Sequence, residues 1–418
     1  MGLTACASDD SPADGSVADA ALDATFDASI DRFVDDRSID RIEDSPPGDA
    51  TSPLVAVTHP RELRAVWLTT VFRLDFPSRT DLSEAEARAE LQAIVDTCRA
   101  AGLNAIFFQV RPESDAVYRS TLEPWSRFVS GGQGIDPGYD PLAILLELGP
   151  PAGLEIHAWV NPFRGLTASA GASDPLHISR RLPAAAIEYN GGITMDPSSP
   201  AVRSHIRTVV VDIVRRYDID GVVFDDYFYP YPDSAGTPFP DDLAYDVYRG
   251  AGGTLTKAAW RRENINSLVS AVGDAVEAER AGVRFGIAPF GIYRPGMPPG
   301  VSGLDSYNVV ASDSVRWLEE EWIDYLAPQL YWPTSSSGQP FEPLVNWWAE
   351  RASPTHPLVP SLALFRLGSG PEWSTAELEE QVRLTRLQGA AAGQTWFRYE
   401  SIRDDVLGIR GILSRLNQ

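Results

Sequence analysis

The chain has 418 residues, of which 44% are apolar, enough for one large α/β domain with additions or for two or three small domains. Its formal net charge is −23, and because an acidic surface repels phosphate backbones, nucleic acid is excluded as an expected partner. The sequence contains neither a Lys/Arg run nor a Gly-rich phosphate loop of the Walker or dinucleotide type.

The first 60 residues are expected to form a disordered acidic tether. They hold thirteen acidic residues against three arginines, a net charge of −10, and few large apolar residues. Acidic residues recur every four positions from Asp19 to Asp35, but stacked like charges oppose a helix. We therefore divide the chain into a tether, residues 1–60, and a folded part, residues 61–418.

Cys6 follows Leu-Thr-Ala, the pattern at which bacterial lipoproteins are cleaved and acylated. Because only Met1 and Gly2 precede this pattern, we interpret the start as a truncated signal remnant, with a chance four-residue match as the alternative. We expect a lipid anchor at Cys6, no other membrane contact, and a cell-envelope location facing the periplasm or the exterior. Cys98, within "ELQAIVDTCRAAGLN", is expected to be a buried free thiol.

From residue 61 onward, strand-like and helix-like segments alternate. Helix-length segments such as 81–102, with Asp81 or Ser83 as its cap, and 374–389 both end on glycine. Eight strands each followed by a helix predict an α/β fold of the (β/α)8 TIM-barrel type. The alternative is an open doubly wound sheet, but the sequence lacks the glycine loop that usually follows the first strand of that fold. The eight short apolar runs typical of strands are 63–70, 105–111, 154–162, 221–228, 284–291, 324–332, 358–365 and 393–399.

Catalytic groups of such barrels lie where strands end, and the fourth predicted strand ends in "FDDYFYP". Val223 and Asp225 are two positions apart, so their side chains point to the same side of the strand. If Val223 fills the barrel, Asp225 points into the mouth and Asp226 leans toward the wall. We predict a catalytic role for Asp225, with a salt bridge to Arg111 or Arg164 as the structural alternative. Asp226 is a further catalytic candidate, although a hydrogen-bonding role suits it as well.

Glycoside hydrolysis requires two carboxyl groups with different roles. One is protonated and assists the departure of the leaving group, and the other is ionised and attacks the sugar or activates water. Candidates for the second group are Glu113 and Asp115, after the second strand, and Glu400, after the eighth. We expect Asp225 to be the nucleophile or the base, Asp115 the proton donor and Glu113 its alternate. His157, in the third strand, is either a core residue or a group that orients the substrate.

The sequence argues against several other chemistries. It lacks HExxH, a Cys-rich cluster and any spaced His/carboxylate set, so no metal and no cofactor are expected. It also lacks the Gly-x-Ser-x-Gly elbow of an esterase. A lyase or aldolase would require a lysine in the mouth, and the strand ends offer none. A barrel that binds glycan without cleaving it remains open, as does another extracellular polysaccharide as substrate.

The folded part resembles the glycosyl-hydrolase-like family ten over nearly all of residues 61–400. The resemblance rests on "ELRAVWLTT", "NAIFFQVRPESDAVYRSTLEPWS", "GYDPL", "GLEIHAWVNPFR", "YDIDGVVFDDYFYP", "WRRENIN", "FGIAPFGIYR" and "IDYLAPQLYW", in matching order. It implies a bacterial, often lipid-anchored barrel, related to a glycosidase of peptidoglycan strands stripped of their stem peptides. The implied function is hydrolysis of a cell-envelope polysaccharide.

The resemblance also implies the site residues. Glu113 departs from the family, which often has a small residue there, and this favours Asp115 as the acid. Strand-end positions add Tyr229 and Arg294 as substrate-binding candidates. Family cleft positions fall on Arg111, Asp115, His157, Asn161, Arg164, Asp225, Asp226, Tyr227, Gln329, Tyr331 and Trp332.

Overall fold

The computed structural model describes residues 62–167, 174–233 and 235–417, all within one compact unit. The predicted tether, residues 1–60, and the predicted lipidation site Cys6 lie outside these residues. Cys98 is a fully buried free thiol, as predicted.

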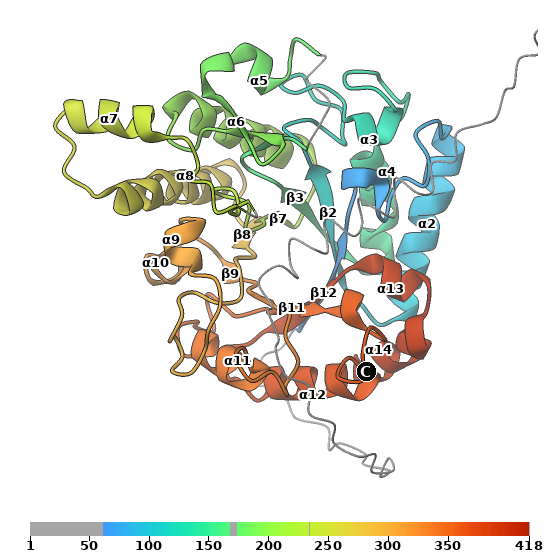
Figure 1. The fold of residues 1–418 in the computed structure, drawn as a ribbon. Helices are drawn as coiled ribbons and strands as arrows, with labels where there is room; N and C mark the ends of the chain where they lie inside the picture. Colours follow the sequence, from blue (N-terminus) through green and yellow to red (C-terminus); the bar gives the residue numbers. More distant parts are fainter. Residues whose placement is uncertain (1–61, 168–173, 234, 418) are drawn as a thin grey trace, which may run out of the picture. The chain divides into compact units, whose positions relative to one another are not determined.

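All eight predicted strands are present in the described part of the chain, and they run parallel around a common centre (Figure 1). Their order in the sheet is β10-β11-β12-β1-β2-β3-β7-β8-β9. The strands are β1 (Leu63–Leu68), β2 (Ala105–Arg111), β3 (Glu155–Val160), β7 (Gly221–Phe224), β8 (Arg284–Ile287), β9 (Tyr325–Leu326), β10 (Gln329–Leu330), β11 (Ser361–Ala363) and β12 (Gly393–Phe397).

The sheet closes through the sixth predicted strand, which the structure divides into β9 and β10. Pro328 lies between the two halves and cannot donate a ladder hydrogen bond. The first half pairs with β8, with Tyr325 opposite Gly286, and the second half pairs with β11, with Gln329 opposite Ser361. One short segment thus supplies both ends of the strand order, which confirms the (β/α)8 barrel.

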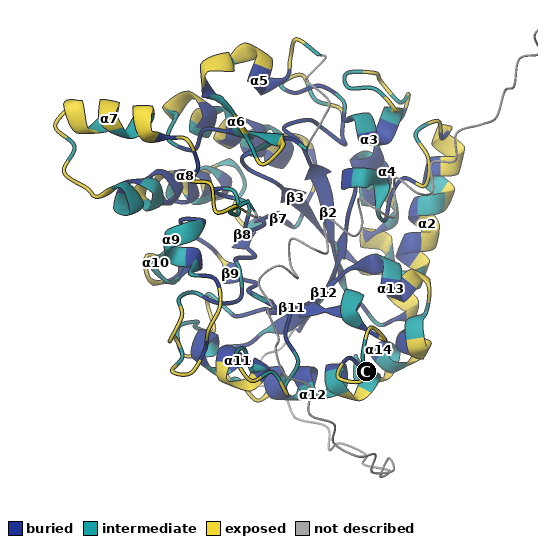
Figure 2. Ribbon diagram, viewed as in Figure 1, coloured by how far each residue is buried: buried dark blue, intermediate teal, exposed yellow. Residues whose placement is uncertain are grey.

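Helices cover the outside of the strands, and Figure 2 shows buried strands inside and exposed helix faces outside. Ser83 caps α2 through a capping box with Glu86, so the predicted serine cap is present. The helices are α2 (Glu84–Ala100), α3 (Arg127–Ser130), α4 (Pro141–Leu148), α5 (Ile178–Arg181), α6 (Pro200–Arg216), α7 (Asp242–Gly250), α8 (Lys257–Glu279), α9 (Ser306–Val309), α10 (Ser314–Glu319), α11 (Phe341–Ala349), α12 (Thr375–Arg386), α13 (Tyr399–Arg403) and α14 (Ile409–Leu416).

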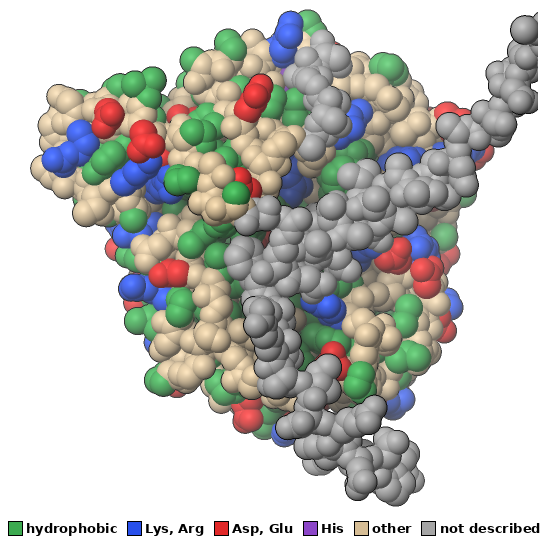
Figure 3. All heavy atoms as spheres, viewed as in Figure 1, with side chains coloured by type: hydrophobic (Ala, Val, Ile, Leu, Met, Phe, Trp, Pro, Cys, Tyr) green, Lys and Arg blue, Asp and Glu red, His purple; other side chains and the backbone are tan. Residues whose placement is uncertain are grey.

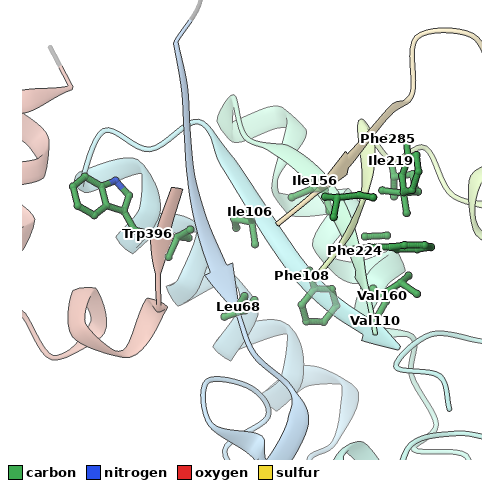
Figure 4. Packing of buried hydrophobic residues seen from close by; sticks show 14 of the residues in the cluster. Leu68, Ile106, Phe108, Val110, Ile156, Val160, Ile219, Phe224, Phe285 and Trp396 are labelled. Atoms are coloured by element: carbon green, nitrogen blue, oxygen red, sulfur yellow. The ribbon is translucent and has the colours of Figure 1, made fainter. Parts of the chain in front are cut away.

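The layer between strands and helices is apolar, because alternate strand residues point outward to the helices. Val222 and Phe224 of β7 belong to this layer, with Phe108 of β2, Ile156 of β3 and Phe285 of β8 (Figure 4). The residues between them face the barrel interior. Trp67 there packs edge-on against Phe107 and Trp159, with ring centroids 4.9 and 5.0 Å apart.

A three-stranded antiparallel sheet follows β3, and the sequence did not predict it. It consists of β4 (Arg164–Leu166), β5 (Ala186–Tyr189) and β6 (Gly192–Met195), in the order β4-β6-β5. Its strands are short and half-buried, so they lack the apolar runs that reveal the barrel strands.

Acidic and basic side chains are interspersed on the face that Figure 3 shows. The described residues include exposed ion pairs such as Arg79 with Asp81, and pairs of this kind contribute only about 0–1 kcal/mol each. Among the described helices, none has both the length and the apolar character needed to cross a membrane.

Candidate active site

Asp225 and Asp226 follow β7 directly, and each side chain is only 4% exposed. Val223 lies opposite Trp159 of β3, and the indole N–H of Trp159 donates to Oδ2 of Asp225 at 3.2 Å. Since Trp159 lies inside the barrel, Asp225 is on the interior side of β7. This confirms the predicted strand parity.

A chain of amide groups fixes which atoms face Asp225. Oε1 of Gln109 accepts the backbone N–H groups of Thr70 and Val71, both at 2.8 Å, so the amide nitrogen of Gln109 must point the other way. That nitrogen donates to Oδ1 of Asn161 at 2.7 Å. The NH2 group of Asn161 therefore faces Asp225 and donates to its Oδ2. Gln109 thus sets the orientation of a residue that contacts the carboxylate.

Burial is the main influence on both carboxyl groups. It raises the pKa of Asp225 to about 7, against the lowering effect of the nearby Arg164, while the adjacent Asp226 raises it further. Burial also raises the pKa of Asp226, opposed by hydrogen bonds from Tyr231 and Gln329. Two neighbouring carboxyl groups in a low dielectric resist double ionisation, so each one raises the pKa of the other.

Arg164, Tyr227 and Tyr331 lie near this pair, whereas Trp332 packs in the core against Phe290. The guanidinium of Arg164 lies 4.3 Å from the centre of the Tyr227 ring. Tyr331 and Trp332 follow β10, each 8% exposed, and the hydroxyl of Tyr331 lies 3.1 Å from that of Ser361. The strand ends of β3, β7 and β10 thus bring together seven of the predicted residues: Asn161, Arg164, Asp225, Asp226, Tyr227, Gln329 and Tyr331.

Glu113 and Asp115 make a different set of contacts. The carboxylate of Glu113 is fully buried and binds Arg127, at 2.9 and 3.2 Å, and both the N–H and the hydroxyl of Thr167. Asp115 is also fully buried and accepts the N–H of Glu113 at 3.0 Å. Its Oδ2 has no hydrogen-bond partner within the described residues. Burial, followed by the charge of Glu113, raises the pKa of Asp115 to about 8.

Arg111 contacts the site through a neighbouring residue and does not contact the carboxyl pair itself. Its guanidinium pairs with Glu123 at 2.6 Å, and neither side chain has any exposed surface. It also donates to the backbone oxygen of Asn161 at 2.7 Å. Burial raises the pKa of Glu123, but Arg111 and then His205 overcome it and hold the pKa at about 2. The predicted substrate ligand Arg111 therefore reaches the site through the backbone of Asn161.

The structure places His157, Tyr229 and Arg294 apart from the carboxyl pair. Nδ1 of His157 lies 2.9 Å from the hydroxyl of Tyr325, level with the first residue of β7, deep in the barrel. Tyr229 is 1% exposed and packs against Phe239. Arg294 lies over the ring of Tyr307, 5.1 Å from its centre.

Glu400 lies in α13, just after β12, and pairs with Arg398 and Arg403. Its backbone N–H donates to Oδ1 of Asp75 at 3.0 Å. Burial raises the pKa of Asp75 to about 6, and the sequence analysis did not single out this residue. Asp75 lies seven positions after the end of the first strand, so strand-end position gave no signal for it.

Sequence reasoning also missed Gln109, Trp159 and Tyr231. Gln109 interrupts the apolar run of β2, and such a polar exception inside a barrel strand was the available signal. Trp159 shares parity with Asn161, which would have placed it inside the barrel. The described residues contain no group of three or more His, Cys, Asp or Glu side chains arranged to hold a metal ion.

A parallel barrel with buried carboxyl groups of raised pKa at its strand ends is typical of barrel glycoside hydrolases. The chain belongs to the family described as Glycosyl hydrolase-like 10, whose model matches residues 62–361. This confirms the resemblance seen in the sequence motifs and places the protein among the glycoside hydrolases.

Two relatives extend this comparison. The chain is 36% identical over 367 residues to Glycosyl hydrolase YngK of Bacillus subtilis (strain 168), with 85% of this chain and 71% of that protein covered. It is 33% identical over 384 residues to Glycosyl hydrolase DigH of Escherichia coli (strain K12), with 85% and 87% covered.

Solved structures show the same fold at low sequence identity. The PgaB (BpsB) glycoside hydrolase domain of Bordetella bronchiseptica has a TM-score of 0.53 at 15% identity, covering 85% of this chain and 99% of that chain. Alpha-L-fucosidase isoenzyme 2 of Paenibacillus thiaminolyticus has a TM-score of 0.54 at 12% identity, covering 85% and 49%.

Proposed function

We propose that the protein hydrolyses glycosidic bonds in a cell-envelope polysaccharide, and that its substrates are peptidoglycan-like glycan strands. The observation that carries the proposal is the buried pair Asp225 and Asp226 at the C-terminal end of β7. One ionised and one protonated carboxyl group are what glycosidic cleavage requires, and a pair with raised pKa values supplies both near neutral pH.

The surroundings of the pair suit a sugar. Aromatic rings such as Tyr227, Tyr331 and Trp332 bury sugar faces, while Arg164 offers hydrogen-bond donors beside them. Asp115 and Glu113 stay candidates for the proton donor, but Glu113 binds Arg127 and Thr167, and Asp115 accepts the N–H of Glu113, which favours a role for both in holding the loop after β2. We therefore assign the proton donor to Asp226.

The test is incubation with purified peptidoglycan, with and without stem peptides, followed by chromatography of the released fragments. We expect fragments from the stripped strands. Asp225→Asn should lose orders of magnitude in turnover and still bind the strands. Asp241→Asn is the matched control, because Asp241 is a buried carboxylate that pairs with Arg261. Binding without release by the parent would favour the glycan-binding alternative, and release from another polysaccharide alone would exclude peptidoglycan.

We further propose that Cys6 carries a lipid anchor and that the acidic segment after it holds the barrel away from a membrane of the cell envelope. The support is the Leu-Thr-Ala-Cys pattern and the composition of residues 7–60. Expressed with an upstream signal, the parent should partition into detergent and Cys6→Ser should not. Equal partitioning of the two would contradict the anchor.

A further inference from the structure

Asp225 and Asp226 are neighbours in the chain, so their Cα atoms lie about 3.8 Å apart. Their side chains have different partners: Asp225 bonds to Trp159 and Asn161 on the β3 side, and Asp226 bonds to Tyr231, in the segment after β7, and to Gln329 of β10. The two acids are thus adjacent in the chain, and their carboxyl groups bond to different neighbours at one strand end.

This arrangement is unusual for direct attack by a protein carboxylate on the sugar. Such an attack requires the nucleophile on the face of C1 opposite the departing oxygen, with the proton donor on the other side. Two acids that are adjacent in the chain can instead contact substituents on two adjacent carbons of the sugar. One can reach the glycosidic oxygen on C1, and the other can reach a substituent on C2.

Asp225 is also built to accept hydrogen bonds. Its Oδ2 accepts from Trp159 at 3.2 Å and from Asn161, and its Oδ1 accepts the backbone N–H of Tyr227 at 3.3 Å. Gln109 fixes the Asn161 amide with its donor toward the carboxylate. Three donors stabilise the ionised form and leave about one lone-pair site free for a further N–H. The ionised Asp225 carboxylate is therefore suited to accept a hydrogen bond from an N–H group of the substrate.

From this geometry we infer that the nucleophile is the 2-acetamido group of the substrate itself, with Asp225 orienting that group through its N–H and Asp226 donating the proton. The inference rests on the proposed function and narrows its substrates to 2-acetamido sugars.

The step balances without another reactant. The carbonyl oxygen of the acetamido group forms a bond to C1 while the C1–O glycosidic bond breaks, and the proton of Asp226 passes to the leaving oxygen. Asp225 stabilises the positive charge of the oxazolinium ring, or takes its N–H proton. Water then attacks C1 and gives its proton to Asp226, and the ring reopens to the acetamide, with Asp225 returning the N–H proton where it had taken it. Two inversions at C1 give net retention.

The decisive experiment changes only the acyl group. Stripped peptidoglycan strands are N-deacetylated and then re-acylated with acetyl, fluoroacetyl or trifluoroacetyl groups. Fluorine withdraws electrons from the carbonyl oxygen, so we expect re-acetylated strands to recover the native rate. Trifluoroacetylated strands should be cleaved at least about 100-fold more slowly, the size of a lost catalytic interaction. Equal cleavage of all acylated strands would overturn the inference and leave the proposed function standing.

The anomeric configuration gives an independent readout. NMR of the product formed first should show retention, and inversion would overturn the inference even with unchanged cleavage. Failure to cleave native strands as well would overturn the proposed function and the inference together.

Variants separate the two acids. Asp226→Asn should lose cleavage of strands by about 100-fold or more, yet retain cleavage of a 2,4-dinitrophenyl 2-acetamido-2-deoxyglucoside, whose leaving group needs no proton. Asp225→Asn should lose both activities and the fluorine dependence. A reversed pattern would overturn the assignment of roles.

Discussion

Replacing Asn161 with leucine should move the pH dependence of catalysis to higher pH. Asn161 donates to Asp225, and leucine keeps the side-chain size without the donor. A hydrogen bond to a charged group is worth about 1.5–3 kcal/mol, which corresponds to about 1–2 pKa units. The pKa of Asp225, already raised by burial to about 7, should therefore rise to about 8–9.

The sign of the effect follows from the role of Asp225. If Asp225 acts when ionised, activity increases with pH through its pKa, so a higher pKa moves this acid limb to higher pH. Well below both pKa values, kcat/KM should fall about 10–100-fold, with recovery at high pH. The assay is the pH profile of kcat/KM on stripped glycan strands, with the melting temperature measured at each pH.

Two further variants sharpen this test. Gln109→Glu keeps the acceptors for the Thr70 and Val71 N–H groups but presents an acceptor to Asn161, so the Asn161 amide should turn and the acid limb should move the same way. Asn264→Leu is the matched control, since Asn264 is buried and bonds to Tyr229. An unmoved limb in Asn161→Leu with intact folding would refute the amide relay.

Other predictions concern stability. Arg111→Met leaves the buried Glu123 with only His205 as its partner and should cost about 3–5 kcal/mol in the free energy of unfolding measured with urea; a loss below about 1 kcal/mol would contradict it. Because the folded pKa of Glu123 is lowered to about 2, its contribution is present above about pH 4.5 and is lost as pH falls toward 2. Ser83→Ala should cost about 1 kcal/mol through the α2 cap, checked by the same titration. Cys98 should react with a thiol reagent only on unfolding, because it is fully buried and burial raises its pKa; fast labelling of the native protein would disprove this.

The sequence alone determined the barrel and the position of the acids. Eight apolar runs separated by amphipathic helices admit few topologies, and the period of two along β7 places Asp225 on the interior side. These are local signals, because the alternation of side chains along a strand indicates which of its residues are buried on each side. The same reasoning did not reveal the small sheet of β4, β5 and β6, whose half-buried strands carry no such pattern.

Only the tertiary structure decided what each polar residue contacts. Arg111 and Asn161 look alike as polar strand ends, yet Arg111 pairs with Glu123 behind the site and Asn161 donates to Asp225. Gln109 acts through its hydrogen bonds to the backbone of Thr70 and Val71, which lie thirty-nine and thirty-eight positions away in the chain. Partners of this kind come from different strands, and their donors and acceptors are assigned only when the barrel closes and burial forces every polar group to find a partner.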